Sequence, residues 1–415
     1  MSAGRVFGAW ALLLLARVAG ADPSLAVLEA TGAELTAVAG TPLERLALLA
    51  CHRSACRPIP FQVDERTADG QWVLPHGPSP IHDQPPAVFD ANDLLLWMAE
   101  DAGERIATPD ALPPHRTALA IEVTGLPGAA SRWVYLLACA DRAPRAAESY
   151  VRYDPSADLL LGRRVALGFK GGIPDRFLSL AEGGRDLLDR FKVRARASLV
   201  WGLLRFGRNE GDLTSELIGW HAGPIRIIRL QRQRIRLGWG IRSPLFSVYT
   251  FFHPDFAELP VALWLNYRPT YFFTDIELEV IVDFLDLRGW RAELPDRHSW
   301  TIDEDEQERK LELSPGRQWF ALHGPQLTLL QVLHVSDSLA PTRRRILYRH
   351  SPQPQPPEDH PGEHPGLGYR IDRFAEVEAG GHGLKSVAYA LPAGTDPKSF
   401  LASRHQVQIG TISRK

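Results

Sequence analysis

The sequence predicts an all-β protein in which a large antiparallel β-sandwich, similar in layout to a supersandwich, follows a smaller β-sandwich domain. Three observations predict this fold class. Short apolar runs recur along the chain and are broken by glycine, proline and aspartate, at spacings typical of all-β domains. Helix signals are scarce. Several longer runs alternate apolar and polar residues, which is the pattern of half-buried strands.

The smaller domain is expected at residues 22–148. Its strand candidates are short, such as LAVLEA, PIPFQVDE and ALAIEVTG, and the last of these alternates in polarity. The segment APRAAESY closes the region, so the domain boundary is placed near residue 148. Two proline-rich segments, 75–86 and 107–115, are expected to be loops within the domain and not linkers.

The larger domain is expected at residues 149–415, where the strand candidates are longer. They include KVRARASLVWGLLRFG, SPLFSVYTFFH, LPVALWLNY and YFFTDIELEVIVDFLDL. DPKSFLASRHQ is the clearest helix candidate, because Asp396 and Pro397 provide a cap and a first turn. FLSLAEGGRDLLDRFK is a second helix candidate, interrupted by two glycines.

The N-terminus has the features of a secretory signal peptide. Arg5 precedes an apolar run that is shorter than the roughly 20 residues needed to cross a bilayer. Ala19, Gly20 and Ala21 fit the small-x-small cleavage rule. We therefore expect residues 1–21 to be a signal peptide and the mature chain to be periplasmic or secreted, with no transmembrane segment after cleavage. An uncleaved membrane anchor is the alternative.

The charge balance is nearly neutral, with 47 basic and 49 acidic residues and a formal net charge of -2. Nucleic-acid binding requires a strongly basic surface, so nucleic acid is excluded as the main partner. Only six of the basic residues are lysine. Arginine forms planar, bidentate pairs with carboxylates, which lysine does not.

Three cysteines are present, at positions 51, 56 and 139. In an oxidising compartment, CHRSAC predicts a disulfide between Cys51 and Cys56 that closes a turn between two strands. Cys139 lies in the apolar segment YLLACAD and is expected to be a buried free thiol. A bridge from Cys139 to one of the other two is the alternative.

The stretch IRIIRLQRQRIRLGWGIR, residues 225–242, holds six arginines. Alternate side chains of a strand share a face, so Arg232, Arg234 and Arg236 are predicted to project together. Gln233 and Ile235 are predicted to face the other way. We call these three arginines the arginine row.

A second strand, DIELEVIVDF at residues 275–284, carries acids on one face and apolar side chains on the other. The acids are Asp275, Glu277, Glu279 and Asp283. We expect this strand to neighbour the arginine row, with a shared core and opposite charges on one sheet surface. One interpretation is a self-neutralising charged ladder. The other is a concave sheet that binds an anionic ligand such as a uronic-acid polysaccharide.

Under the ligand interpretation, aromatic side chains near the arginine row supply stacking platforms for sugar rings, although most aromatics are expected in the core. A histidine at a strand end can act as a general acid or base, or can simply be a hydrogen-bonded surface residue. No catalytic residue is assigned. The predicted ligand-binding residues are Arg232, Arg234, Arg236, Trp239, His253, Glu277 and Glu279.

Two polar clusters allow a metal site or a purely structural role. Asp90, Asn92 and Asp93 offer oxygen ligands suited to calcium, or an Asx turn that begins a strand. His360 and His364 lie in EDHPGEHPG, where proline and glycine forbid the helix that would align them, so a surface loop is the alternative. No metal ion and no cofactor is assigned.

Two blocks of sequence resemble a pattern found in uncharacterised secreted bacterial proteins. The first is PIPFQVDERTADGQWVLP followed by FDANDLLLWMAEDAG, and the second is SELIGWHAGPIRIIRLQRQRIRL with its Gly-Pro-Ile-Arg step. The resemblance implies a sandwich similar to those of aldose epimerases and polysaccharide lyases. The paired histidines and glutamate base of the epimerases are not matched, so it implies architecture and no catalytic residue.

The function predicted from these features is carbohydrate binding or carbohydrate chemistry outside the cytoplasm, with acidic sugars as the candidate ligands. The alternative is a non-enzymatic envelope protein whose sheet face docks another periplasmic or outer-membrane protein, because arginine and aromatic residues are enriched at interface centres. Whether the protein is an enzyme is left open.

Overall fold

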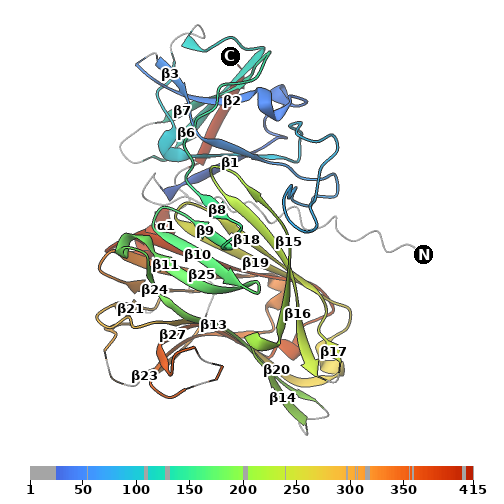
Figure 1. Ribbon diagram of the computed structural model, residues 1–415, viewed down its shortest axis with the longest axis vertical. Helices are drawn as coiled ribbons and strands as arrows, with labels where there is room; N and C mark the ends of the chain where they lie inside the picture. Colours follow the sequence, from blue (N-terminus) through green and yellow to red (C-terminus); the bar gives the residue numbers. More distant parts are fainter. Residues whose placement is uncertain are drawn as a thin grey trace, which may run out of the picture. The chain divides into compact units, whose positions relative to one another are not determined.

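The computed structural model shows an almost entirely β protein (Figure 1), which confirms the predicted fold class. The predicted signal peptide, residues 1–21, and Trp239 lie outside the described residues. The structure describes residues 25–53, 55–106, 111–126, 131–199, 204–238, 240–295, 298–303, 305, 307–313, 318–354, 356–357, 359–403 and 408–414.

One of the two helix predictions is confirmed and the other is wrong. The helix α1 (Pro397–Ser403) lies where the Asp-Pro signal places it. The second candidate, residues 177–192, is instead strand and turn, running from β11 (Ile173–Ser179) through β12 (Arg185–Asp186) into β13 (Leu188–Leu199). Its two glycines, Gly183 and Gly184, have φ values of 72° and 85°, a left-handed conformation that turns the chain and ends any helix.

The chain forms two compact units. Unit 1 comprises Met1–Arg152, Gly219–Ile227 and Asp396–Lys415, and unit 2 comprises Tyr153–Ile218 and Ile228–Thr395. The division predicted at residue 148 did not include the two later segments that return to unit 1. The C-terminal segment returns because its isoleucines, Ile409 and Ile412, pack against the unit 1 core.

Unit 1 is built from two antiparallel sheets that enclose one core. Their strand orders are β1-β5-β4 and β29-β6-β7-β2-β3. Trp97, Leu48 and Ile121, from three different strands, are fully buried in that core. The bounds are β1 (Val27–Thr31), β2 (Leu46–His52), β3 (Ala55–Pro58), β4 (Phe61–Asp64), β5 (Leu94–Met98), β6 (Thr117–Thr124), β7 (Arg132–Ala138) and β29 (Gln408–Arg414).

The two blocks of sequence that carry the family resemblance meet inside unit 1. Gln62 Oε1 accepts hydrogen bonds from the backbone N–H groups of Ile225 and Arg226, at 3.1 and 2.9 Å. Asp64 Oδ2 accepts from Arg226 Nε at 2.5 Å, and the Arg226 guanidinium lies 5.0 Å from the Trp72 ring centroid. The Gln-Val-Asp and Gly-Pro-Ile-Arg motifs therefore hold a returning segment in place.

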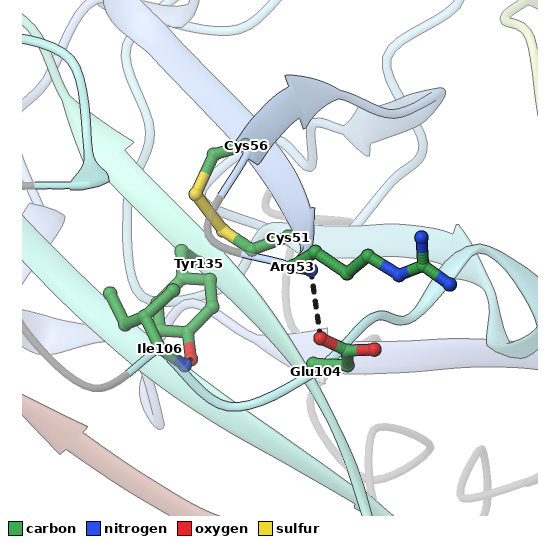
Figure 2. The surroundings of a disulfide bond; sticks show 6 residues. All are labelled: Cys51, Arg53, Cys56, Glu104, Ile106 and Tyr135. Atoms are coloured by element: carbon green, nitrogen blue, oxygen red, sulfur yellow. Dashed lines mark hydrogen bonds between the residues drawn. A yellow bond between two sulfur atoms is a disulfide. The ribbon is translucent and has the colours of Figure 1, made fainter.

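The predicted disulfide is confirmed: Cys51 on β2 is bonded to Cys56 on β3 (Figure 2). The turn beside it is held by the Arg53 N–H, which donates to Glu104 Oε2 at 2.8 Å. The Tyr135 hydroxyl accepts a hydrogen bond from the Ile106 N–H at 2.7 Å. Cys139 is a buried free thiol, as predicted. A disulfide fits an oxidising compartment.

Unit 2 contains a six-stranded sheet of order β14-β13-β20-β27-β26-β23 and a ten-stranded sheet of order β15-β16-β18-β19-β28-β25-β24-β21-β22, with β17 paired to β16. The strands of the six-stranded sheet, beyond β13, are β14 (Leu204–Arg208), β20 (Phe273–Phe284), β23 (Gln307–Glu312), β26 (Arg343–Ser351) and β27 (Glu363–Asp372). The strands of the ten-stranded sheet are β15 (Leu213–Ala222), β16 (Ile227–Gly238), β17 (Ile241–Arg242), β18 (Phe246–Phe252), β19 (Phe256–Leu265), β21 (Arg291–Glu293), β22 (Ser299–Thr301), β24 (Trp319–His323), β25 (Leu327–Val335) and β28 (Gly380–Pro392).

A third, five-stranded sheet of order β12-β11-β10-β9-β8 completes unit 2. Its remaining strands are β8 (Arg152–Asp154), β9 (Leu159–Leu161) and β10 (Val165–Lys170).

The expectation that the arginine row neighbours the acidic strand is wrong. The arginine row lies on β16, which belongs to the ten-stranded sheet, whereas the acids lie on β20 in the six-stranded sheet. The physical reason is that β20 has basic neighbours of its own. It pairs with β13 and β27, and their Arg196 and Arg370 lie beside its carboxylates.

Candidate functional site

The arginine row projects from the outer face of the ten-stranded sheet. Arg232, Arg234 and Arg236 are exposed, while the intervening Gln233 and Ile235 are buried or half-buried and face the interior. The alternation of a strand therefore gathers the three guanidinium groups on one surface, as predicted.

The predicted ligand-binding acids do not join that surface. The register places Arg196 of β13 opposite Glu277 and Arg370 of β27 opposite Glu279. Arg196 Nη1 lies 3.0 Å from Glu277 Oε1, and Arg370 Nη1 lies 3.3 Å from Glu279 Oε1. Burial raises the pKa of the Glu277 carboxyl, which the Arg370 charge opposes. These acids are neutralised within the six-stranded sheet by arginines of β13 and β27, so the charged ladder predicted between the arginine row and β20 does not form.

His253 also lies apart from the exposed arginines. It follows the end of β18, is only 3% exposed, and stacks on the Phe256 ring with centroids 4.0 Å apart. The neighbouring Asp255 is buried and pairs with Arg164 and Arg163. The described members of the predicted site therefore fall into three separate settings.

The feature that the sequence did not predict is a large apolar cavity inside unit 2. Its volume is about 460 Å³, within the range of about 300–1,000 Å³ that is typical of ligand pockets. The inner faces of the six-stranded and ten-stranded sheets form its walls, and β10 and β11 of the five-stranded sheet contribute further apolar side chains. Most of the lining residues are valine, leucine, isoleucine and phenylalanine.

The burial of β20 shows that this interior is not filled. Its apolar inner residues Leu278, Val280 and Val282 are only half-buried, although they face the interior. Its acidic outer residues Glu279 and Asp283 are 2% and 0% exposed. An interior at ordinary packing density leaves few voids larger than a water molecule. The half-exposed inner face is therefore the wall of an open space.

The rest of the sandwich is packed in the ordinary way. A cluster of fully buried side chains joins β21, β24, β25, β26 and β27, and it includes Ala292, Leu327, Ile346 and Leu367, each 0% exposed. The cavity therefore occupies only part of the space between the sheets, and the packed cluster fixes the fold around it.

Two polar side chains of β16 interrupt the apolar lining of the cavity. They lie where this strand runs beside β15 and the turn that precedes β11. Gln231 lines the cavity, is 2% exposed, and its Nε2 has no hydrogen-bond partner. The neighbouring Gln233 Nε2 donates weakly to Gly172 O and Ser215 Oγ, each at 3.4 Å. A Cβ at position 172 would lie 2.6 Å from Gln231 Nε2, so this glycine makes room for the amide. A buried amide donor without a partner is costly, and a ligand acceptor would satisfy it.

The outer face of the six-stranded sheet holds a sealed ionic cluster behind the cavity wall. Lys192 Nζ lies 2.5 Å from Asp283 Oδ2 and 3.4 Å from Glu363 Oε1, and all three side chains are 0% exposed. Arg349 Nη1 lies 3.4 Å from the same Glu363 oxygen. Burial raises the pKa of Asp283 to about 8, against the opposing attraction of the Lys192 ammonium. These enclosed charges pair with one another across the strands of the six-stranded sheet and do not meet solvent.

The polar cluster at residues 90–93 is used structurally. Asp90 Oδ1 accepts from the Asn92 N–H at 2.9 Å, and Asp93 accepts from the N–H groups of Asp90 and Arg66 at 2.9 and 3.0 Å. This is the geometry of an Asx turn. Burial raises the pKa of Asp93 to about 7.

The histidines of the proline-rich loop lie beside groups of the protein itself. His364 Nε2 lies 3.1 Å from Pro361 O, and the exposed His360 lies 4.0 Å from Asp189. Within the described ranges, no group of three or more His, Cys, Asp or Glu side chains is placed to hold a metal ion. Across the same residues, no helix has the length and apolarity needed to cross a membrane.

Comparison with known proteins gives only distant structural likenesses. No family model and no curated protein matches the chain. Among solved structures, an α-mannosidase from Enterococcus faecalis V583 is similar over 92% of this chain and 47% of its own, at 9% identity and a TM-score of 0.41. The chain thus spans about half the length of that structure. A likeness this distant carries no argument about function.

The sequence contained one signal of the cavity. Gln231 and Gln233 occupy the inward-facing positions of β16, where a filled core would take apolar residues. The size of the cavity could not be predicted, because it depends on how far apart two sheets lie after all their side chains have packed.

Proposed function

We propose that unit 2 binds a long-chain amphiphile, such as a fatty acid or a lipid with one inserted chain, in the apolar cavity. The observation that carries this proposal is the half-exposed apolar inner face of β20 across from the inner face of β19. An apolar chain placed there gains burial on both sides, at roughly 25 cal/mol per Å² of apolar surface removed from water.

The buried amide of Gln231 indicates which chemical group the other end of the ligand carries. Its unpartnered Nε2 donor needs an acceptor, and a carboxylate, ester or amide carbonyl supplies one. A ligand with an apolar chain and one head group that accepts a hydrogen bond matches both the apolar lining and the Gln231 amide. Neutral sugars do not, since most of their hydroxyl groups would be left without partners in an apolar space.

The test is binding of a fluorescent long-chain fatty acid to the purified full chain. Val261 and Ala262 are adjacent on β19 and face opposite sides: Val261 lines the cavity, and Ala262 is exposed on the outer face. Val261→Trp places an indole ring inside the cavity and should weaken fatty acid binding, while the matched control Ala262→Trp should leave it unchanged. Equal binding by both variants would overturn the proposal.

A second candidate function rests on the outer face of the ten-stranded sheet. Trp264 is 48% exposed and projects from β19 on the same face as the arginine row. Arginine pairs bidentately with carboxylates, and an exposed aromatic ring stacks on sugars, so this face suits an acidic polysaccharide. The double variant Arg234→Ala/Arg236→Ala, assayed against a panel of acidic polysaccharides, tests this candidate. Loss of binding with the fold retained supports it.

The location that fits both candidates is the periplasm or the extracellular space. The disulfide supports an oxidising compartment. The docking of another envelope protein on the same outer face is the alternative to polysaccharide binding, and pull-down competition by the polysaccharide separates the two.

A further inference from the structure

The described part of unit 2 carries a group of exposed, large apolar side chains, which we call the apolar rim. Large apolar side chains on a protein surface mark interaction sites when they gather in one place. The rim comprises Leu204, Leu245, Trp264, Tyr267, Tyr271 and Phe272, which are between 44% and 68% exposed.

The strand registers bring the rim residues to one end of unit 2. Leu199 of β13 pairs with Leu204 on one side and with Phe273 on the other, so Leu204 lies beside the start of β20. Phe272 immediately precedes that start, and the Phe273 and Phe206 ring centroids are 6.1 Å apart. In Figure 1 the labels β14, β17 and β20 lie at the same end.

The other rim residues belong to the ten-stranded sheet at its adjoining edge. The pairing of Ser247 with Ala262 and of Val248 with Val261, continued along the strands, places Leu245 opposite Trp264. Tyr267 and Tyr271 lie on the connection between β19 and β20, which joins the two sheets at this end. The rim thus lies where the six-stranded and ten-stranded sheets are joined.

The cavity extends toward the rim. Leu263 and Leu265 line the cavity and flank the rim residue Trp264 on β19. Ile276 lines it from β20, four positions after Phe272. An apolar chain that entered between the sheets at the rim would therefore meet lining residues at once.

Basic residues surround the rim. Arg205 follows Leu204, Arg242 precedes Leu245, and both are exposed. Arg236 of the arginine row pairs in register with Arg242. The described exposed acids near the rim are Asp275, opposite Ser198, and two acids that are already paired: Glu378 with Arg268, and Glu376 with Arg373. The charge around the rim is therefore predominantly positive.

We propose that the apolar rim docks on an anionic lipid bilayer, with its rings in the interface and its arginines on the headgroups, so that the amphiphile enters the cavity from the membrane. The delivery step rests on the proposed function, whereas docking does not. Tryptophan and tyrosine favour the membrane interface, and basic residues near an anionic bilayer add to binding. A protein partner and a soluble acidic polysaccharide are the alternatives to this occupant.

The experiment is co-flotation of the full chain with vesicles of phosphatidylcholine alone and of phosphatidylcholine mixed with phosphatidylglycerol. The wild type should float with the anionic vesicles and much less with the neutral ones. The double variant Tyr271→Ser/Phe272→Ser should weaken this binding at least about tenfold. Thr270→Ser, an exposed substitution in the same connection, is the matched control and should bind as the wild type does.

Each outcome separates docking from the proposed function. The double variant changes no cavity-lining residue, so its binding of soluble fluorescent fatty acid should equal that of the wild type. A wild type that ignores anionic vesicles but binds the fatty acid overturns docking and leaves the cavity function standing. Vesicle binding unchanged in the double variant overturns the rim as the contact. Binding of an acidic polysaccharide with no vesicle binding overturns docking in favour of the polysaccharide candidate.

Discussion

In a usual sandwich strand the inner face is the more buried of the two, whereas along the middle of β20 the outer face is the more buried. Its outer face carries Glu279 and Asp283, which are almost fully enclosed, and its inner face carries Leu278 and Val280, which remain half-exposed. The outer face is sealed by ion pairs to the neighbouring strands. Leu278 and Val280 on the inner face line the cavity. The burial of the two faces therefore indicates that β20 keeps its position without a filled core on its inner side.

This arrangement suits a binding cavity, because a wall that depended on interior packing would collapse when the interior was left open. The ionic cluster around Lys192 and the packed cluster near Leu367 hold the six-stranded sheet from the outside and from one end. Substitutions in these two clusters measure how much each contributes to stability.

Disrupting the buried ion pairs on the outer face of the six-stranded sheet should have the largest effect on the free energy of unfolding. Lys192→Met removes the ammonium group that Asp283 and Glu363 share in the buried cluster, and the loss of one partner from a buried ion pair costs about 3–5 kcal/mol. Urea denaturation measures this loss. The matched control is Lys310→Met, an exposed lysine on β23 of the same sheet, which should change stability by less than about 0.5 kcal/mol. Similar effects at the two positions would mean that the cluster does not support the wall.

Truncation of inner-face leucines should distinguish the packed region from the open one. Leu367→Ala on β27 creates a new void in a filled core and should cost about 2–5 kcal/mol. Leu278→Ala on β20 enlarges a space that already exists and should cost less, about 1 kcal/mol, which is the central value for point substitutions. Both residues belong to one sheet, so denaturation midpoints compare them directly. Equal losses would show that the interior around Leu278 is filled.

The pH dependence of stability should reveal the enclosure of Asp283. Its pKa is raised from the usual 3.8 to about 8 by burial. Between those values the folded chain holds a proton that the unfolded chain releases, so the contribution of Asp283 to stability falls as pH rises from about 4 to about 8. Asp283→Asn cannot titrate and should flatten this part of the profile. An identical slope in the wild type and the variant would contradict the assignment.

Much of the fold could be predicted because alternation and turn residues are local signals. The alternation on β16 and β20, the disulfide of CHRSAC and the Asp-Pro helix start were all correct. The partner of β20 could not be predicted, since arginines occur on β13 and β27 as well as on β16 and the pairing depends on topology. The cavity was missed for a similar reason: apolar undersides reveal which way a strand faces and not how much space lies behind it.

Removing the polar contact in the cavity should have the smallest effect. Gln231→Leu keeps the shape of the wall and deletes the unpartnered amide donor. One net hydrogen bond is worth about 0.5–1.5 kcal/mol, so the affinity for a fluorescent fatty acid should fall about two- to tenfold. A titration measures it, with the methyl ester and an alkane analogue as probes of the head group. Unchanged affinity for the acid would remove Gln231 from the site.

A crystal structure of the full chain soaked with a brominated long-chain fatty acid would show whether the apolar cavity of unit 2 is the ligand site. We expect anomalous bromine signal between the six-stranded and ten-stranded sheets of unit 2, with the carboxylate within hydrogen-bond distance of Gln231. Lining side chains that meet across the interior and leave no room for a chain, or bromine found only on the outer faces, would contradict it.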